Sequence, residues 1–311
     1  MTEPPLRRRP SARTLLALLG FCGLLPRALH ASLAPMIACG ADFLGVRHAR
    51  TTETNLALAY PELPLGARRA LARRSLVADA RLALELPSTL RARPLTLLQR
   101  VAGAEAAEQL ARAQRSGRGV LLLVPHLGNW ELLCLWLQAR ADAARPFTAL
   151  FRPLRDPELD RWLRARRERS GARLVPTDPA GLRTLLRVLR SGGMVGVLPD
   201  QVPAPGSGIH APFHGRDALT MTLVRGLVRR CAPEVLAITA LRRAHGYRIH
   251  LLPADPAVGD DDPRSAATAL NRTLEACIAL APEQYQWGYK RYRWPPGSGD
   301  DYYVVRRPAG S

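Results

Sequence analysis

The sequence predicts an α/β protein: a mainly parallel central sheet covered by helices, with a membrane-associated helical segment at its N-terminus. Short, wholly apolar runs of the kind that form strands buried on both faces alternate with stretches of helical period. A nearly uncharged stretch, residues 14–41, follows a basic start. The chain has 311 residues, of which 47% are hydrophobic, and that is enough to bury a sizeable core.

The first 45 residues have the composition of a membrane anchor. Several arginines between residues 7 and 13 precede an apolar run, 14–25, which Pro26 and Arg27 interrupt before it reaches the roughly 20 residues of a spanning helix. We expect residues 1–45 to be an uncleaved anchor that is kinked or lies in the membrane interface, with its arginines on the cytoplasmic side. A cleaved signal peptide and core helices of a soluble protein are the alternatives. Residues 46–311 would then form the main domain.

Helical stretches come first in this domain, and strands follow. Residues 48–63, 66–86 and 103–119 carry apolar residues at helical spacing. Five apolar runs typical of strands come after them, at 120–125, 147–153, 194–200, 234–243 and 247–253. The clearest helix between strands begins at Asp178-Pro179, a cap followed by proline, and stops at Gly192-Gly193.

Polar residues follow four of these predicted strands directly. In parallel sheets the functional groups lie just past the carboxyl ends of the strands. We therefore expect these residues to meet along one edge of the sheet. They are His126 after the first run, Arg152 and Arg155 after the second, Asp200 and Gln201 after the third, and Arg242 and Arg243 after the fourth.

The stretch LLLVPHLGNWELL, residues 121–133, places a histidine and a carboxylate where a buried strand turns into a helix. Asn129 is the natural N-cap, which puts Glu131 in the first turn, within reach of His126. A carboxylate on one ring nitrogen leaves the other free to accept a proton. No serine or cysteine lies nearby as a nucleophile, so the activated hydroxyl would belong to the substrate. The plain alternative is a histidine that only packs, and the pair lacks the further ligands of a zinc site.

Charge and cysteines narrow the class of partner. The net charge is +19, almost all from arginine, since Lys290 is the only lysine. This charge indicates an anionic partner, although a genome rich in GC codons gives the same composition. The five cysteines are widely spaced without a C-x-x-C pair. We expect reduced, mostly buried thiols, no metal site and no cofactor.

The stretch HLGNWE resembles the H-x4-E motif of the bacterial lipid A biosynthesis acyltransferase family, the secondary lauroyl/myristoyl acyltransferases. The resemblance continues in order along nearly the whole chain. It is carried by NLALAYPEL, FRPLRDPELDRWLRARRERSG, GVLPDQVPAPGSGIHAPFHGRDALTMT and PEQYQWGYKRYR.

This resemblance implies an enzyme on the cytoplasmic face of the inner membrane. It would move an acyl chain from acyl carrier protein to a hydroxyl of a lipid A precursor, and residues 46–311 would be the acyltransferase domain. His126 and Glu131 match the catalytic positions, while Arg152 and the Asp200-Gln201 pair would shape the site. The family includes relatives that use other glycolipid or lysophospholipid acceptors, and that alternative stays open.

In this reading His126 takes the proton of the acceptor hydroxyl and Glu131 orients the imidazole. Backbone N–H groups of Gly128 and Asn129, or the Arg152 guanidinium, could stabilise the oxyanion. The arginines of 152–173 could hold lipid phosphates, meet the acidic carrier, or form a solvated helix face. The apolar catalytic helix either belongs to the core or lines an acyl groove with one side.

A nucleic-acid-binding protein is the alternative from another class. The segment YKRYRWPP, residues 289–296, interleaves basic and aromatic side chains that can stack on bases. No known binding fold accompanies it, and the apolar N-terminus is left without a role. We therefore expect no nucleic-acid partner.

Overall fold

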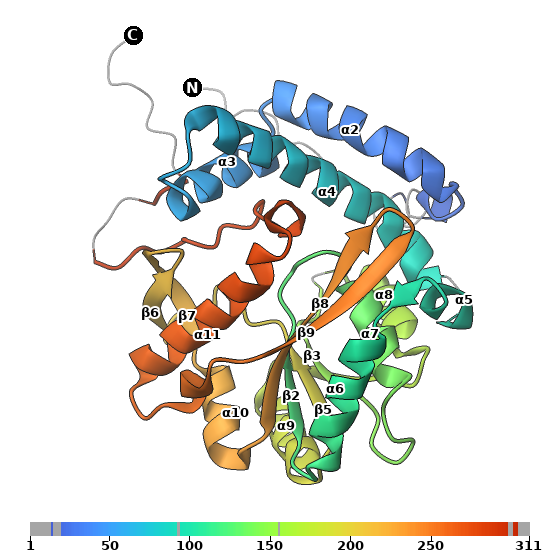
Figure 1. Ribbon diagram of the computed structural model, residues 1–311, viewed down its shortest axis with the longest axis vertical. Helices are drawn as coiled ribbons and strands as arrows, with labels where there is room; N and C mark the ends of the chain where they lie inside the picture. The colour runs from blue at the N-terminus through green and yellow to red at the C-terminus, as the bar shows by residue number, and fades with distance from the viewer. Residues whose placement is uncertain (1–13, 15–19, 92–93, 155, 298–300, 304–311) are drawn as a thin grey trace.

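The computed structural model describes residues 14, 20–91, 94–154, 156–297 and 301–303 (Figure 1). At the centre of these residues is a seven-stranded sheet in the order β1-β9-β8-β2-β5-β3-β4. Its strands are β1 (Val101–Ala102), β2 (Val120–Leu123), β3 (Thr148–Phe151), β4 (Arg173–Pro176), β5 (Met194–Val197), β8 (Glu234–Arg243) and β9 (Gly246–Pro253). Strand β2 runs parallel to β8 and β5, β3 to β5 and β4, and β1 to β9. Only the β8–β9 hairpin among these pairs is antiparallel, so the predicted mainly parallel sheet is confirmed.

All five predicted strands are present, and four strands were not predicted. Strands β1 and β4 are short, and β4 begins with an exposed arginine. The hairpin of β6 (Gly208–Phe213) and β7 (Arg216–Met221) stands apart from the main sheet. Only part of each strand of this hairpin is buried. Polar or strand-breaking residues such as His210, Pro212 and Asp217 therefore stand among the apolar ones. Such strands have no continuous apolar run by which they could be recognised.

Two hydrophobic cores lie on opposite faces of the sheet. Leu121 and Leu123 of β2 pack into one core, whereas Val120 and Leu122 pack into the other, as the two-residue period of a strand requires. Figure 1 shows α6 and α7 on one side of the sheet and α10 and α11 on the other. The helices of the domain are α5 (Pro94–Leu98), α6 (Ala104–Arg115), α7 (Glu131–Gln138), α8 (Pro157–Glu168), α9 (Pro179–Arg190), α10 (Leu223–Cys231) and α11 (Pro263–Ala279).

Helix α9 has the ends that its sequence predicts. The Asp178 carboxylate accepts a hydrogen bond from the backbone N–H of Gly181 at 2.7 Å, with proline at the first helical position. Past the other end, Gly192 has a φ of +79°, a conformation that glycine adopts without a steric penalty. These ends return the chain to β5 and so place residues 198–201 at the edge where β2 also ends.

Three N-terminal helices cover one end of the domain: α2 (Arg27–Phe43), α3 (Arg47–Ala59) and α4 (Leu65–Arg91) (Figure 1). Asn55 of α3 donates from its side-chain amide to the carbonyl oxygens of Trp287, at 2.5 Å, and Tyr289, at 2.6 Å. Helix α3 is therefore bound to the C-terminal part of the chain. His48 of α3 bonds Asp79 of α4 at 2.8 Å.

Helix α2 begins directly after Pro26, where the apolar run of the sequence is interrupted. Among the described residues, a single helix of sufficient length and hydrophobicity to cross a membrane is not found. A pair bent by 85°, Leu29–Phe43 with Arg47–Ala59, meets those criteria by length and composition. The basic start of the chain lies outside the described residues, and the division at residue 45 stays a prediction.

Candidate active site

The catalytic candidates lie on the loop that joins β2 to α7. Gly128 in this loop has a φ of +63°, and a Cβ there would lie 2.3 Å from the carbonyl oxygen of Ala240. Only glycine allows the loop to pass so close to β8. The N–H of Gly128 donates to the carbonyl oxygen of Gln284 at 3.0 Å, and that of Asn129 to Ala240 at 2.9 Å. Both N–H groups are therefore occupied in this structure, which disfavours them against Arg152 as the candidate donors for an oxyanion.

His126 meets Asp200 across the edge of the sheet. The carboxylate oxygens of Asp200 lie 2.7 Å from Nδ1 and from the backbone N–H of His126. Asp200 is 2% exposed, so it is shielded from solvent beside the imidazole. Burial alone would raise the pKa of Asp200, but the imidazole and the two hydrogen bonds outweigh burial and lower it. An ionised Asp200 places the ring proton on Nδ1.

The other ring nitrogen of His126 contacts Gln201. The side-chain amide nitrogen of Gln201 lies 3.2 Å from Nε2, which accepts a hydrogen bond when the ring proton is on Nδ1. Asp200 and Gln201 therefore hold one nitrogen each. This tautomer leaves the lone pair on Nε2, as the general-base role expected of His126 requires.

Glu131 lies in the first turn of α7 as predicted, but its partner is different. Nε of Arg167 donates to its carboxylate at 2.8 Å, and a second guanidinium nitrogen makes a further, shorter contact. Glu131 does not accept the expected hydrogen bond from His126, and the carboxylate of Asp200 accepts it instead. Burial lowers the pKa of Arg167, but the charge and hydrogen bond of the Glu131 carboxylate raise it by more, so the guanidinium stays charged. Spacing along the chain could not reveal this pair, because Arg167 comes from α8.

Asn129 does not cap α7. The cap position is Trp130, without a side-chain hydrogen bond, and Asn129 is buried. Its amide donates to Thr89 at 3.0 Å and to the Tyr247 hydroxyl at 3.1 Å. Tyr247 in turn donates to Glu85 at 3.0 Å. Tertiary contacts therefore hold Asn129 inside the protein and away from the helix end.

The described arginines that follow the strands have different surroundings. Arg152 is exposed just after β3, and Arg155 lies outside the described residues. Arg242 is buried, with its Nε 2.9 Å from a Glu85 oxygen. The roles of Glu85 and Tyr247 could not be predicted from the sequence, because neither residue stands beside a recognisable motif. They fix the loop from behind, through Asn129.

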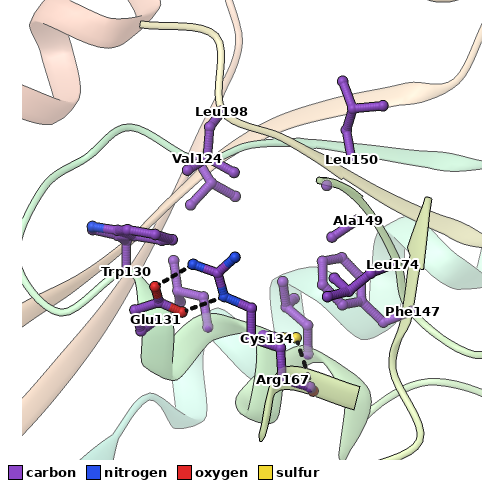
Figure 2. A pocket seen from close by; sticks show the side chains of 13 residues that line it. Val124, Trp130, Glu131, Cys134, Phe147, Ala149, Leu150, Arg167, Leu174 and Leu198 are labelled. Carbon is purple, nitrogen blue, oxygen red and sulfur yellow. Dashed lines mark hydrogen bonds and ion pairs between the residues drawn. The ribbon is translucent and has the colours of Figure 1, made fainter. Parts of the chain in front are cut away.

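Two cavities flank the loop on either side of Trp130. The smaller one, about 50 Å³, lies between α7, α8 and the strands (Figure 2). Figure 2 shows Trp130 and the Glu131–Arg167 pair on one side of it, and Phe147 and Leu174 on the opposite side. Helix α7 thus lines a cavity with one side, while Leu132 and Trp136 on its other side belong to the core.

The larger cavity is an open cleft of about 510 Å³ between α2, α4 and the loop. Trp130 and Glu131 line it as well as the smaller cavity. The Trp130 ring also contacts His126, with ring centroids 4.9 Å apart. Both cavities therefore meet the catalytic candidates at one place.

The basic and aromatic segment near the C-terminus is buried at its centre and exposed on either side. Arg291 is 1% exposed, and its guanidinium donates to the Leu219 carbonyl and to Thr220. Tyr292 is buried as well, whereas Tyr289 and Trp294 are exposed. Packing thus accounts for Arg291 and Tyr292 and not for the exposed members of the pattern. Of the cysteines, Cys277 is buried, Cys39 is exposed and the other three are half-buried, so the expectation of mostly buried thiols is wrong.

A model of the bacterial lipid A biosynthesis acyltransferase family matches residues 11–294 of this chain. The chain belongs to this family. It is similar to the lipid A biosynthesis lauroyltransferase of Escherichia coli (strain K12), with 29% identity over 194 residues and 61% of each chain covered. It is also similar to the palmitoleoyltransferase of that organism, with 29% identity over 210 residues and 64% of each chain covered. These alignments span less than two thirds of either relative.

A longer alignment joins the chain to the lipid A biosynthesis myristoyltransferase of Escherichia coli (strain K12). It has 24% identity over 249 residues and covers 79% of this chain and 76% of the relative. The names of the three relatives share lipid A biosynthesis and differ in the acyl chain. Family membership confirms the resemblance recognised from the sequence motifs.

Proposed function

We propose that the protein transfers a fatty acyl chain from acyl carrier protein to a hydroxyl of a lipid A precursor, at the cytoplasmic face of the inner membrane. The observation that carries the proposal is the His126–Asp200 pair, in which the Asp200 carboxylate lies 2.7 Å from Nδ1 and Nε2 keeps its lone pair beside the Gln201 amide. Family membership supports the lipid acceptor. The exposed apolar side chains of α2, among them Met36 and Phe43, support the membrane location.

In the proposed reaction, Nε2 of His126 takes the proton of the acceptor hydroxyl as its oxygen attacks the thioester carbonyl carbon. General-base help of this kind contributes roughly 10²–10⁴ in rate. Asp200 stabilises the imidazolium that forms. The tetrahedral intermediate collapses as the C–S bond breaks, and the imidazolium proton passes to the leaving thiolate.

The oxyanion needs a hydrogen-bond donor other than the two occupied N–H groups of the loop. The Gln201 amide is the nearest, at 3.2 Å from Nε2. Once a hydroxyl takes its place on Nε2, this amide is free to donate to the developing oxyanion. Arg152, exposed at the same edge of the sheet, is the second candidate. We assign Glu131 a structural role near the reacting atoms. Its ion pair with Arg167 stabilises the wall that separates the two cavities.

The test combines a purified assay with lipid mass spectrometry. The wild-type protein should transfer the chain of an acyl carrier protein thioester to a lipid A precursor, and His126→Ala should reduce this to background without lowering the melting temperature. His245→Ala, in an exposed turn, is the matched control. A strain without the protein should make lipid A that is lighter by one acyl chain. Unchanged lipid A with altered glycerophospholipids would contradict the proposal in favour of a lysophospholipid acceptor.

A further inference from the structure

The cleft of about 510 Å³ has the size and lining of a lipid-chain site. Pockets for small ligands commonly measure about 300–1,000 Å³. The smaller cavity, at about 50 Å³, is far below that range. In the described residues, the cleft is therefore the space beside His126 that already has room for a fatty chain.

Small side chains from two helices make the cleft walls smooth. Ala38 and Ala41 of α2 face it from one side, and Ala80 and Ala83 of α4 from the other. Leucines of α4 extend this apolar surface, and the rest of the lining carries the polar residues His48, Asp79, Glu131, Gln286 and Tyr289. The apolar part gains from each methylene group that it removes from water and makes no demand on hydrogen bonding. It therefore fits an alkyl chain better than a sugar or a phosphate.

Helix α2, which forms the outer wall of the cleft, and the residue directly after it carry strongly exposed apolar side chains. Phe43 is 89% exposed, Leu44 is 73% and Met36 is 69%. Ile37 lines the cleft and is itself 47% exposed, so the apolar surface continues from the outside of α2 into the cleft. A chain that leaves a bilayer in contact with α2 reaches the cleft without crossing water.

The inner end of the cleft lies at the catalytic loop. Trp130 lines it there, against His126, and the backbone N–H of Gln286, another lining residue, donates to the carbonyl oxygen of His126 at 3.0 Å. The indole nitrogen of Trp130 has no hydrogen-bond partner within the described part of the chain. Figure 2 shows this nitrogen on the side away from the smaller cavity. This nitrogen is itself buried, so it could donate to the polar head of a chain only after the ring turns toward the cleft.

We propose that the cleft between α2 and α4 binds the hydroxyl-bearing fatty chain of the lipid acceptor, which enters from the membrane alongside α2. This inference rests on the proposed function. The tail would lie against Ala80 and Ala83, and the hydroxyl near the head of the chain would meet Nε2 of His126.

The test uses variants that place a larger side chain on one wall of the cleft or on the other. Ala80→Leu on α4 and Ala41→Leu on α2 fill it, and Ala70→Leu, exposed elsewhere on α4, is the matched control. Acceptors that share a head group and carry short or long hydroxyacyl chains are compared in detergent micelles. Exclusion of one or two methylene groups should lower kcat/KM for the long acceptor roughly tenfold, through KM. The short acceptor, the control and the donor-chain preference should stay unchanged.

Two results would overturn the assignment. A shift in donor-chain preference would place the donor chain in the cleft, and equal losses for short and long acceptors would show that the cleft does not measure the acceptor chain. Binding of the same acceptors without a donor separates this inference from the proposed function. Weaker binding of the long acceptor by both cleft variants supports the cleft site whatever the turnover. Normal binding by wild type without any acylation counts against the function.

Discussion

Asp200 holds Nδ1 of His126 at 2.7 Å, although 74 residues separate the two in the chain. The same carboxylate accepts the backbone N–H of His126, so it fixes both the ring and the loop that carries it. This is the position expected of Glu131 from sequence spacing. The difference changes which carboxylate should matter for proton transfer.

Asp200→Asn should lower kcat roughly 10²-fold or more. An asparagine has one oxygen, so it cannot accept from both Nδ1 and the backbone N–H of His126. Either the loop N–H or the correct ring tautomer is lost. Steady-state kinetics beside Asp217→Asn, a carboxylate in an ion pair on β7, would measure the effect. Near-normal turnover by Asp200→Asn would remove it from the mechanism.

Glu131→Gln should destabilise the protein as well as slow it. Removal of one partner of a buried ion pair typically costs about 3–5 kcal/mol, because the other charge stays buried without compensation. Arg167→Gln should cost a similar amount, and the double variant less than the sum. Denaturant unfolding of the four proteins measures the coupling between Glu131 and Arg167. Additive losses would mean that the pair contributes little.

Gly128→Ala should lower the melting temperature and the activity together. Its φ of +63° is strained for alanine, and the new Cβ would lie 2.3 Å from the Ala240 oxygen. Gly226→Ala in α10 is the control, because a Cβ there meets nothing within 4 Å and alanine favours a helix. A Gly128→Ala protein as stable as wild type would show that the loop can move away from β8.

The donor preference should depend on arginines of α8 that are free to meet an acidic carrier. Arg167 is bound to Glu131, and Arg164 donates to Glu168 and to the Leu174 carbonyl, so reversing them would disturb the fold. Arg161 is exposed and is the better probe. Arg161→Glu should lower kcat/KM with acyl carrier protein more than with coenzyme A, and added salt should narrow the gap.

Arg190→Glu, an exposed arginine on α9, carries the same charge change elsewhere and serves as the control for Arg161→Glu. Both donors are assayed with the acceptor saturating, so that charge effects on acceptor binding do not enter. If Arg161→Glu slows both donors equally, this face of α8 does not select the carrier.

The contact between α3 and α4 should weaken as pH rises. The hydrogen bond to Asp79 raises the pKa of His48 above 6.5, against the lowering effect of burial. A raised folded-state pKa contributes stability that is fully present below about pH 6.5 and is lost as pH rises through the folded value. The melting temperatures of wild type and Asp79→Asn should differ most below about pH 6.5, and the gap should narrow as pH rises through the raised pKa of His48. A gap independent of pH would mean that His48 stays neutral.

Local chemistry determined much of this protein. Apolar runs identified the five strands, the Asp178-Pro179 start and the Gly192 stop bounded α9, and spacing placed Glu131 in the first turn of α7. Each of these depends on neighbours a few residues away, through hydrogen bonds and side-chain period. The order of polar residues after the strands likewise brought Asp200 and Gln201 to His126, because parallel strands end at one edge.

Only the tertiary structure decided which of these groups are partners. Asp200 is closer to His126 in space than Glu131 because β5 lies beside β2, whereas Glu131 turns to Arg167 of a different helix. Asn129 does not cap α7, because its side chain is buried and donates to Thr89 and Tyr247. These choices depend on burial, where an unpaired charge or amide is costly, and on helices packed from distant segments. Sequence spacing contains no measure of either.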